Sequence, residues 1–265
     1  MEVVVASPLL ETKLHVPERR RSVVPRSRLI ERLRRGAESA LTLVSAPAGF
    51  GKTTLLTEWL TAAPVEGTAA AWLSLDQRDN DPALFWTYMI TALRTAKPAV
   101  GANALALLSS GPAPMEAVLA TLLNDVQALQ HEVVLVLDDY HLIEAHDVHE
   151  GMAFLLEHRP PQMHLVIASR SDPPLPLARL RAQGDLVEIR AAELRFTLEE
   201  ATAYLNEVMG LELTPADVEA LEGRTEGWIA ALQLAALSMQ GRDDIADHRG
   251  LRRGRPLHRR LPGRR

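Results

Sequence analysis

Short, continuous apolar runs recur along the first two-thirds of the chain and predict buried strands. The strongest runs are residues 41–46 and 133–137, which are rich in leucine and valine. Weaker runs of the same kind are residues 70–75, 164–168 and 186–189. Runs without polar alternation are typical of strands that are buried on both faces of a parallel sheet.

The segments between these runs have the length and the apolar spacing of helices. Asp81 and Pro82 predict one helix start, because an aspartate caps the first turn and proline is favoured at the first helical position. Helices are predicted over residues 83–96, 115–130 and 148–157. Strands that alternate with helices predict an α/β fold with a parallel sheet.

The pattern becomes purely helical in the last third of the chain. Thr197 with Glu200 has the form of a capping box, and Thr214 followed by Pro215 offers a second helix start. We therefore predict a small all-helical subdomain over residues 193–246. Apolar residues recur at helical spacing within it, at Trp228, Leu232, Ala235 and Met239.

Charge is distributed unevenly, and the end of the chain differs from the rest. The net charge is −5, but residues 248–265 hold eight arginines and no acid, which leaves 21 basic and 34 acidic residues elsewhere. An acidic body is a poor general binder of nucleic acid, and we expect no direct DNA binding. Residues 247–265 have two interpretations. One is a shifted reading frame in GC-rich DNA, where out-of-frame codons often encode Arg, Gly and Pro, and the ratio of 26 arginines to 3 lysines indicates such DNA. The other is a genuine basic arm for nucleic acid or membrane.

Two absences bear on location. No apolar run reaches the roughly 18 residues that a membrane span needs, and the first charges follow a short apolar stretch, unlike the order in a signal peptide. The chain has no cysteine, which excludes disulfide scaffolds, cysteine–zinc sites and thiol catalysis. We predict a cytoplasmic protein that does not bind membranes.

The first strong strand runs into a phosphate-binding pattern. Residues 46–53, APAGFGKT, precede a helix predicted over residues 54–62 and match a P-loop with alanine in place of its first glycine. The two glycines let backbone N–H groups approach phosphate oxygens, Lys52 can bridge the β- and γ-phosphates, and Thr53 can ligate Mg²⁺. The alternative is a glycine-rich turn that binds nothing. The predicted nucleotide-binding residues are Ala46, Pro47, Ala48, Gly49, Phe50, Gly51, Lys52, Thr53 and Thr54.

The second strong strand ends in Asp138 and Asp139, a Walker B pattern. A carboxylate at the carboxyl end of a strand beside a P-loop is placed to hold Mg²⁺. Thr53 and Asp138 are therefore the predicted metal ligands, and Asp139 is the candidate to orient or deprotonate the attacking water. The alternative for this acidic pair is a solvated turn between strand and loop.

A third strand ends just before Arg170, which could contact the γ-phosphate and report its loss. The alternative for Arg170 is a surface ion pair or a loop anchor. Asp76 and Asp79 follow another strand, where turn and capping roles are favoured over support of a metal or a water. The predicted catalytic residues are Asp139, Lys52 and Arg170, and Arg170 is also counted with the nucleotide-binding residues.

Two other polar clusters are predicted to be structural. Residues 19–21 with Arg26 and Arg28 are interpreted as a solvated basic face. Three histidines near the acidic pair lack the spacing of a zinc-binding motif, and a solvated helix start is favoured. These histidines are His141, His146 and His149.

With these residues placed, the chain resembles the nucleotide-binding part of the MalT-like regulators of the LuxR family, which belong to the STAND class of signal-transduction ATPases. The similarity extends over about residues 9–246. Besides the P-loop and Walker B segments, it rests on the strings WLSLD, LVIASRSDPPLPLARLRAQG, ELRFTLEEA and TEGWIAALQLAALSMQGRDDI.

The resemblance implies an ASCE-type sheet in which the strand before Arg170 lies between the P-loop and Walker B strands. It also implies an ATP/ADP switch, in which ADP holds a closed form, and ATP with an inducer favours an open form that self-associates and activates transcription. Lys13, Pro17 and Arg28 belong to a segment that covers the nucleotide base in such proteins. Related proteins touch the nucleotide with a Gly-x-Pro motif, and Ile229 stands in place of that proline here.

The predicted organisation is an N-terminal segment over the nucleotide site, residues 1–38, a P-loop NTPase domain, residues 39–192, the helical subdomain, residues 193–246, and the tail, residues 247–265. Regulators of this family continue into a winged-helix segment, a helical-repeat sensor and a helix-turn-helix, and the chain contains none of them. We expect a truncated regulator that neither senses an inducer nor binds an operator alone.

Two other functions compete with the switch. One is a free-standing P-loop ATPase whose hydrolysis is itself the function, and the other is an ATP-binding body with a basic nucleic-acid arm. The acidic pair supports ATP hydrolysis both in a switch and in a free-standing ATPase, so the motifs do not distinguish these two functions. A switch should hydrolyse ATP slowly and retain ADP, whereas an enzyme should turn over many ATP molecules per minute.

Overall fold

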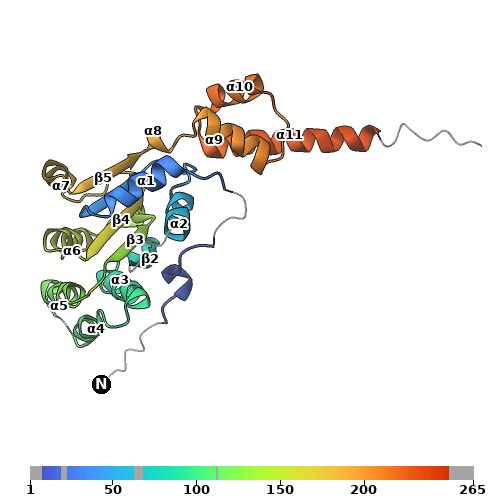
Figure 1. The fold of residues 1–265 in the computed structure, drawn as a ribbon. Helices are drawn as coiled ribbons and strands as arrows, with labels where there is room; N and C mark the ends of the chain where they lie inside the picture. The colour runs from blue at the N-terminus through green and yellow to red at the C-terminus, as the bar shows by residue number, and fades with distance from the viewer. Residues whose placement is uncertain (1–7, 19–22, 63–67, 112, 251–265) are drawn as a thin grey trace, which may run out of the picture. The chain divides into compact units, whose positions relative to one another are not determined.

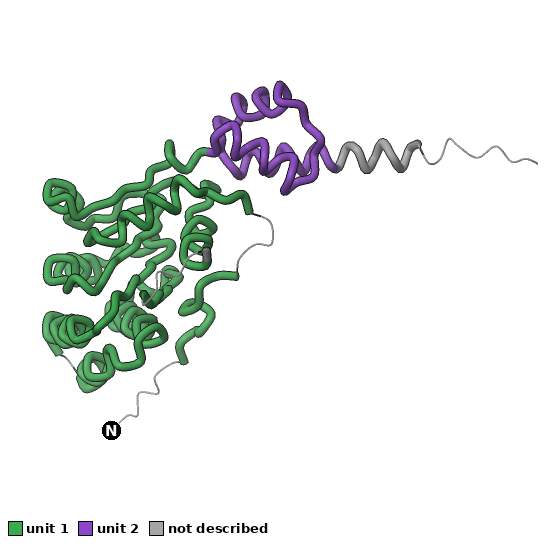
Figure 2. The backbone as a smooth tube through the Cα atoms, viewed as in Figure 1, with its two compact units in different colours: residues 1–195 green, residues 196–265 purple. Residues whose placement is uncertain are grey.

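The computed structural model describes residues 8–18, 23–62, 68–111 and 113–250, and the chain divides into two compact units (Figure 1, Figure 2). The first unit, residues 1–195, is built on a five-stranded parallel sheet with the strand order β2-β3-β4-β1-β5. The second unit, residues 196–265, is helical where it is described. The predicted α/β fold with a helical appendage is therefore confirmed.

All five predicted strands are present, and their ends lie within one residue of the predicted bounds. Neighbouring strands pair in parallel throughout the sheet. The third predicted strand lies between the other two that carry site motifs, as the resemblance implied. The carboxyl ends of these three strands therefore meet at one edge of the sheet. The strands are β1 (Leu41–Ser45), β2 (Ala69–Ser74), β3 (Val133–Asp138), β4 (Met163–Ser169) and β5 (Leu186–Arg190).

The helices predicted between the strands are also present. Asp81 caps α3 by accepting a hydrogen bond from the backbone N–H of Leu84 at 2.9 Å, and Pro82 is the first residue of that helix, as predicted. The short helices α4, α7 and α8 were not predicted, because they are too short to show a full amphipathic pattern. The helices of the first unit are α1 (Ser27–Gly36), α2 (Lys52–Ala62), α3 (Pro82–Ala96), α4 (Ala102–Ser109), α5 (Met115–Gln127), α6 (His146–Glu157), α7 (Leu177–Gln183) and α8 (Ala191–Leu194).

The sheet is covered on both faces, which explains why its strands are continuously apolar. Leu135 and Leu137 of β3 belong to one core layer, with the buried residues of α3, α5 and α6. Val134 and Val136 belong to the other layer, with α1 and α2. Successive residues of a strand point to opposite faces, so every position of β3 is buried.

A buried histidine on β4 makes the stability of this sheet depend on pH. His164 is 3% exposed, and its Nδ1 donates to the Ser39 carbonyl oxygen at 2.8 Å. Burial lowers the pKa of His164 to about 4, from an unfolded value near 6.5. Above pH 6.5 the neutral ring is favoured in both states. Below pH 6.5 the ring is protonated in the unfolded chain but stays neutral in the folded chain until the pH nears 4. The free energy of unfolding therefore falls by up to about 3 kcal/mol as the pH falls from 7 to 4. Urea denaturation at several pH values should show this loss in the wild type and in His131→Gln, and a shallower loss in His164→Gln. Equal slopes for the two variants would contradict the prediction.

The helical unit begins at residue 196 and confirms the predicted capping box and the predicted second helix start. Thr197 and Glu200 cap one helix reciprocally, and Thr214 and Asp217 cap another. Among the described helices, none combines the length and the hydropathy needed to cross a bilayer. The elements of this unit are α9 (Leu198–Thr202), the π-helix η4 (Ala203–Val208), α10 (Pro215–Thr225) and α11 (Ile229–Gly250).

Helix α11 differs from the prediction in its exposed apolar residues and in its length. Leu232 of the predicted stripe is fully buried, whereas Leu234 and Leu237, which lie outside it, are 64% and 50% exposed. The helix also extends to Gly250 and so enters the predicted tail. Both interpretations of the tail concern residues that otherwise lie outside the described part of the chain.

Candidate nucleotide-binding site

The loop between β1 and α2 adopts a phosphate-loop geometry. It runs from the end of β1 to Lys52, the first residue of α2, so the helix starts two residues before the predicted position. Gly49 and Gly51 have φ angles of 79° and 77°, in the left-handed region that residues with a side chain rarely adopt. The loop ends at a helix N-terminus, where backbone N–H groups and the helix dipole favour an anion such as a phosphate.

The Lys52 side chain folds back over this loop. Its Nζ donates to the carbonyl oxygens of Ala46 at 2.7 Å and Pro47 at 3.1 Å, and the residue is 7% exposed. Burial lowers the pKa of Lys52, and the charges of Asp139 and Asp138 oppose this shift. A buried ammonium group bound to neutral carbonyl oxygens is well placed to exchange them for phosphate oxygens.

The next residue of α2 contacts the end of β3. Thr53 Oγ1 donates to Asp138 Oδ2 at 2.8 Å. Asp138 is 3% exposed, and burial raises the pKa of its carboxyl group to about 6, although the hydrogen bond from Thr53 acts in the opposite direction. Mg²⁺ prefers oxygen ligands and is usually held by one or two protein groups together with substrate phosphates. The hydroxyl and the buried carboxylate therefore fit the chemistry of a Mg²⁺ site.

Asp139 lies in a different environment from its neighbour. Its φ angle of 58° is left-handed, a conformation that aspartate and asparagine tolerate better than most residues. Its backbone N–H donates to Asp138 Oδ1 at 3.0 Å, and its side chain is 45% exposed. The turn thus separates a buried carboxylate from one that water can reach.

Arg170 directly follows β4 and is exposed. It follows Ser169, which lies opposite Ser45 in the parallel register of β4 and β1, so it is next to the start of the loop between β1 and α2. Its charge lowers the pKa of both Lys52 and His141. Within the described part of the chain it makes no hydrogen bond or ion pair, so the alternative of a surface ion pair is not observed. An unneutralised guanidinium group at this edge of the sheet suits a bound anion.

A cavity of about 290 Å³ lies beside the first turns of α2. Pro17 is among its lining residues, so part of the N-terminal segment lies beside the first turns of α2. Arg28 of the same segment instead donates to the carbonyl oxygen of Arg195 at 2.8 Å. The lining residues are Pro17, Glu18, Val23, Thr53, Thr54, Thr57 and Glu58.

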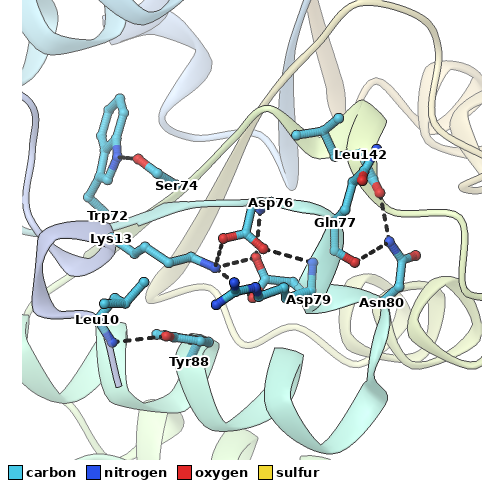
Figure 3. A network of polar contacts seen from close by, with 11 residues as sticks. Leu10, Lys13, Trp72, Ser74, Asp76, Gln77, Asp79, Asn80, Tyr88 and Leu142 are labelled. Atoms are coloured by element: carbon cyan, nitrogen blue, oxygen red, sulfur yellow. Dashed lines mark hydrogen bonds and ion pairs between the residues drawn. The ribbon is translucent and has the colours of Figure 1, made fainter. Parts of the chain in front are cut away.

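Lys13 is not at the phosphate loop but in a buried ion pair (Figure 3). Its Nζ donates to Asp79 Oδ1 at 2.7 Å and to Asp76 Oδ2 at 3.2 Å, and it lies 4.3 Å from the centre of the Tyr88 ring. The side chains of Lys13 and Asp79 are 10% and 0% exposed. This network attaches the N-terminal 3₁₀ helix η1 (Glu11–Leu14) to α3 and to the segment after β2.

The two aspartates of this network have the capping role that the sequence favoured. Asp76 and Asp79 form a reciprocal capping box on the 3₁₀ helix η2 (Gln77–Asn80). The last residue of η2, Asn80, was not predicted as a site residue. Its side chain donates to the carbonyl oxygen of Leu142 at 2.8 Å and accepts hydrogen bonds from two backbone N–H groups of the same loop, those of Glu144 and Ala145. Asn80 therefore holds the loop that follows β3, and its position at the end of a capped turn was the signal for it.

The basic cluster near the N-terminus is only partly a solvated face. Arg28 is exposed, but Arg26 is 5% exposed and its Nη2 donates to the carbonyl oxygens of Leu194 and Arg195 at 3.1 Å and 3.0 Å. The prediction for Arg26 was wrong, because carbonyl groups at the end of α8 compensate the buried guanidinium group. Residues 19–21 lie outside the described residues.

The three histidines have separate surroundings. His149 Nδ1 is 3.0 Å from the Tyr140 hydroxyl, in a buried contact. His146 is exposed beside Glu150 at 3.2 Å, and His141 is 3.8 Å from Asp139. The described residues contain no group of three or more His, Asp or Glu side chains that could hold a metal ion.

Comparisons with known proteins define the class of this chain. Residues 19–168 match the family model of the AAA ATPase domain. The chain is 38% identical over 224 residues to the serine/threonine-protein kinase PknK of Mycobacterium tuberculosis (strain ATCC 25618 / H37Rv), covering 84% of this chain and 20% of that protein. It is 38% identical over 231 residues to the HTH-type transcriptional regulator MalT of Serratia proteamaculans (strain 568), covering 87% of this chain and 25% of that protein.

The fold also matches a solved structure. The STAND protein with a tetratricopeptide-repeat sensor from Pyrococcus horikoshii superposes with a TM-score of 0.60 at 18% identity, over 82% of this chain and 30% of that one. The chain belongs to the AAA ATPase domain family, and the predicted similarity to the nucleotide-binding region of MalT is confirmed. It spans 20% to 25% of the length of these curated relatives.

Proposed function

We propose that this chain is an ATP/ADP switch module that binds its nucleotide with Mg²⁺. The observation that carries the proposal is the arrangement of Lys52, Thr53 and Asp138, which brings an ammonium group, a hydroxyl and a buried carboxylate to a helix N-terminus. Membership of the AAA ATPase domain family supports nucleotide binding independently of this geometry.

Each group of the site has a proposed task. Backbone N–H groups of residues 46–54 bind the phosphates, and Lys52 neutralises charge on the β- and γ-phosphates. Thr53 and Asp138 hold Mg²⁺, which when bound withdraws charge from the phosphate oxygens. Asp139 orients or deprotonates the attacking water, and Arg170 contacts the γ-phosphate and responds to its loss.

The relatives suggest the context in which the module works. One is named as a protein kinase and the other as an HTH-type transcriptional regulator, yet both share this segment. A nucleotide switch serves either kind of output, because its conformation can be read by a different neighbouring domain. We accordingly propose a part of a multidomain cytoplasmic regulator of the MalT-like type that self-associates in its ATP form. Residues 1–38 would cover the nucleotide, residues 39–192 bind it and residues 193–246 respond to it.

Calorimetric titration tests the proposal. Purified chain is stripped of bound nucleotide and titrated with Mg-ADP and Mg-ATP, and steady-state hydrolysis is followed in parallel. The switch predicts tight ADP binding and slow turnover. A folded chain that binds neither nucleotide would contradict the proposal, and turnover of many ATP molecules per minute would instead favour a free-standing ATPase. The accessible carboxylate of Asp139 is the feature that keeps this second function open.

Replacing Asp139 should separate binding from hydrolysis. Asp139→Asn is expected to lower the hydrolysis rate by at least about 100-fold, because an amide cannot accept the proton of the attacking water. Asparagine tolerates the left-handed backbone at this position, so ATP affinity should change little. The exposed Asp147→Asn is the matched control. A rate for Asp139→Asn within a few-fold of the wild type would remove Asp139 from the reaction.

A further inference from the structure

A second cavity lies at the opposite end of the sheet from the phosphate loop. Its volume is about 300 Å³, and it is lined by α6, α7 and the segments that precede β1, β4 and β5. Buried residues of α6 and α7 belong to the same core layer, and the two helices lie side by side in Figure 1. Because β1, β4 and β5 are parallel, their amino ends meet here, whereas the phosphate loop follows the carboxyl end of β1. The cavity is therefore separate from the nucleotide site.

Arg159 lines this cavity as a partly buried cation without an acidic partner. Its Nη1 donates to the carbonyl oxygens of Pro160, at 3.3 Å, and of Met163, which hold the guanidinium group in place. Within the described part of the chain it forms no ion pair, and its Nε and Nη2 donate to no residue. Burial lowers the pKa of Arg159, and the charge of Asp185 opposes this shift. The remaining N–H groups of a fixed guanidinium group suit the carboxylate of a ligand.

Asp185 brings the opposite charge to the same cavity. Its backbone N–H donates to the carbonyl oxygen of Leu180 at 2.9 Å, and its carbonyl oxygen accepts from the N–H of Leu41 at 3.1 Å, so its backbone is held on both sides. Its carboxylate makes no hydrogen bond or ion pair with any residue that the structure describes, although its charge acts on Arg159. A cation and an anion thus face one cavity without pairing with each other.

The other lining residues add little net charge. Arg179 and Glu157 form an ion pair with each other at 2.8 Å. Apart from Gln183, the remaining lining is apolar, and it suits an aliphatic group of a ligand. These apolar residues are Ala40, Ala153, Leu156, Pro176 and Leu180.

We propose that this cavity binds a small aliphatic amino acid. Arg159 binds its carboxylate, Asp185 binds its ammonium group, and the apolar residues contact its side chain. A zwitterion is favoured over a simple carboxylate or a phosphate, because those anions would leave Asp185 unpaired and be repelled by it. Binding there does not require a nucleotide at the phosphate loop.

The test is calorimetric titration of the whole chain with L-leucine and two analogues. 4-Methylpentanoate lacks the ammonium group and 3-methylbutylamine lacks the carboxylate, and each should bind at least about tenfold more weakly than L-leucine. Arg159→Gln and Asp185→Asn should each weaken L-leucine binding by a similar factor. Arg35→Gln is the control, since that side chain is 74% exposed, and it should have no effect. Lys52→Ala should bind L-leucine as the wild type does, because the phosphate loop is not the site.

Two further measurements do not depend on removing a charge. Ala153→Phe fills the cavity and should abolish L-leucine binding, and melting temperatures report whether each variant folds. In the wild type labelled with ¹³C-methyl alanine, L-leucine should shift the methyl resonances of Ala40 and Ala153.

Three outcomes would overturn the inference. The first is a folded wild type that does not bind L-leucine up to about 10 mM. The second is equal affinity for L-leucine in the wild type and in both charge variants. The third is a set of methyl shifts that leaves Ala40 and Ala153 unchanged. A chain that binds L-leucine but no nucleotide would contradict the proposed function and support the amino-acid site.

Discussion

Lys52→Ala is expected to lower the affinity for both Mg-ATP and Mg-ADP by on the order of 100-fold. The ammonium group is buried and bound to carbonyl oxygens of its own loop, so it is already positioned where phosphate oxygens would arrive. Its loss removes a charge-assisted contact from the nucleotide complex. Calorimetric titration measures the effect, and an affinity for ADP within threefold of the wild type would contradict it.

The fold should not depend on this lysine. Burial lowers the pKa of Lys52, which means that the nucleotide-free protein holds the charged form at some cost. Lys52→Ala should therefore melt at a temperature equal to or above that of the nucleotide-free wild type. A large drop in melting temperature would mean that the loss of binding reflects misfolding and not the missing contact.

The chain offers an internal control for this prediction, because it contains only three lysines. Lys13 is buried in an ion pair, Lys52 lies at the proposed phosphate site, and Lys97 is partly exposed at the end of α3. Acylation of the wild type, read by peptide mass spectrometry, should be slowed by Mg-ADP at Lys52 alone. Equal modification of Lys52 with and without ADP would place the nucleotide elsewhere.

Local patterns predicted most of the sheet and the central part of the site. All five strands were found from apolar runs, because a strand buried on both faces has a sequence signature within a few residues. The approach of Thr53 to Asp138 followed from two motifs at the ends of nearby parallel strands. Each of these features is marked by a short motif within the segments that form it.

Contacts between segments that lie far apart in the sequence could not be predicted in this way. Lys13 pairs with Asp79, which is 66 positions away, and Arg26 reaches the carbonyl group of Leu194, which is 168 positions away. A single lysine or arginine in a polar segment has no periodicity that distinguishes a buried ion pair from a solvated side chain. The resemblance implied that Lys13 belongs to a segment over the nucleotide base, but in the structure its ammonium group forms an ion pair with Asp79.

This buried pair carries the second large prediction, which concerns stability. Lys13→Met is expected to lower the free energy of unfolding by about 3 kcal/mol, because it leaves the carboxylate of Asp79 buried without its cation. The backbone N–H of Asp76 still donates to Asp79 at 2.7 Å, which keeps the loss at the lower end of the range for broken buried pairs. Urea denaturation measures the change, and Lys97→Met should stay within about 0.5 kcal/mol of the wild type.

A double-mutant cycle separates the charge from the packing. Asp79→Asn together with Lys13→Met removes both charges, and the double variant should lose much less stability than the two single variants added together.

Because Asp79 caps η2 and Asn80 ends it, Lys13→Met should also speed hydrogen exchange at the backbone N–H groups of Glu144 and Ala145. Additive losses and unchanged exchange would show that the N-terminal segment is attached by packing and that its charge does not support the loop after β3.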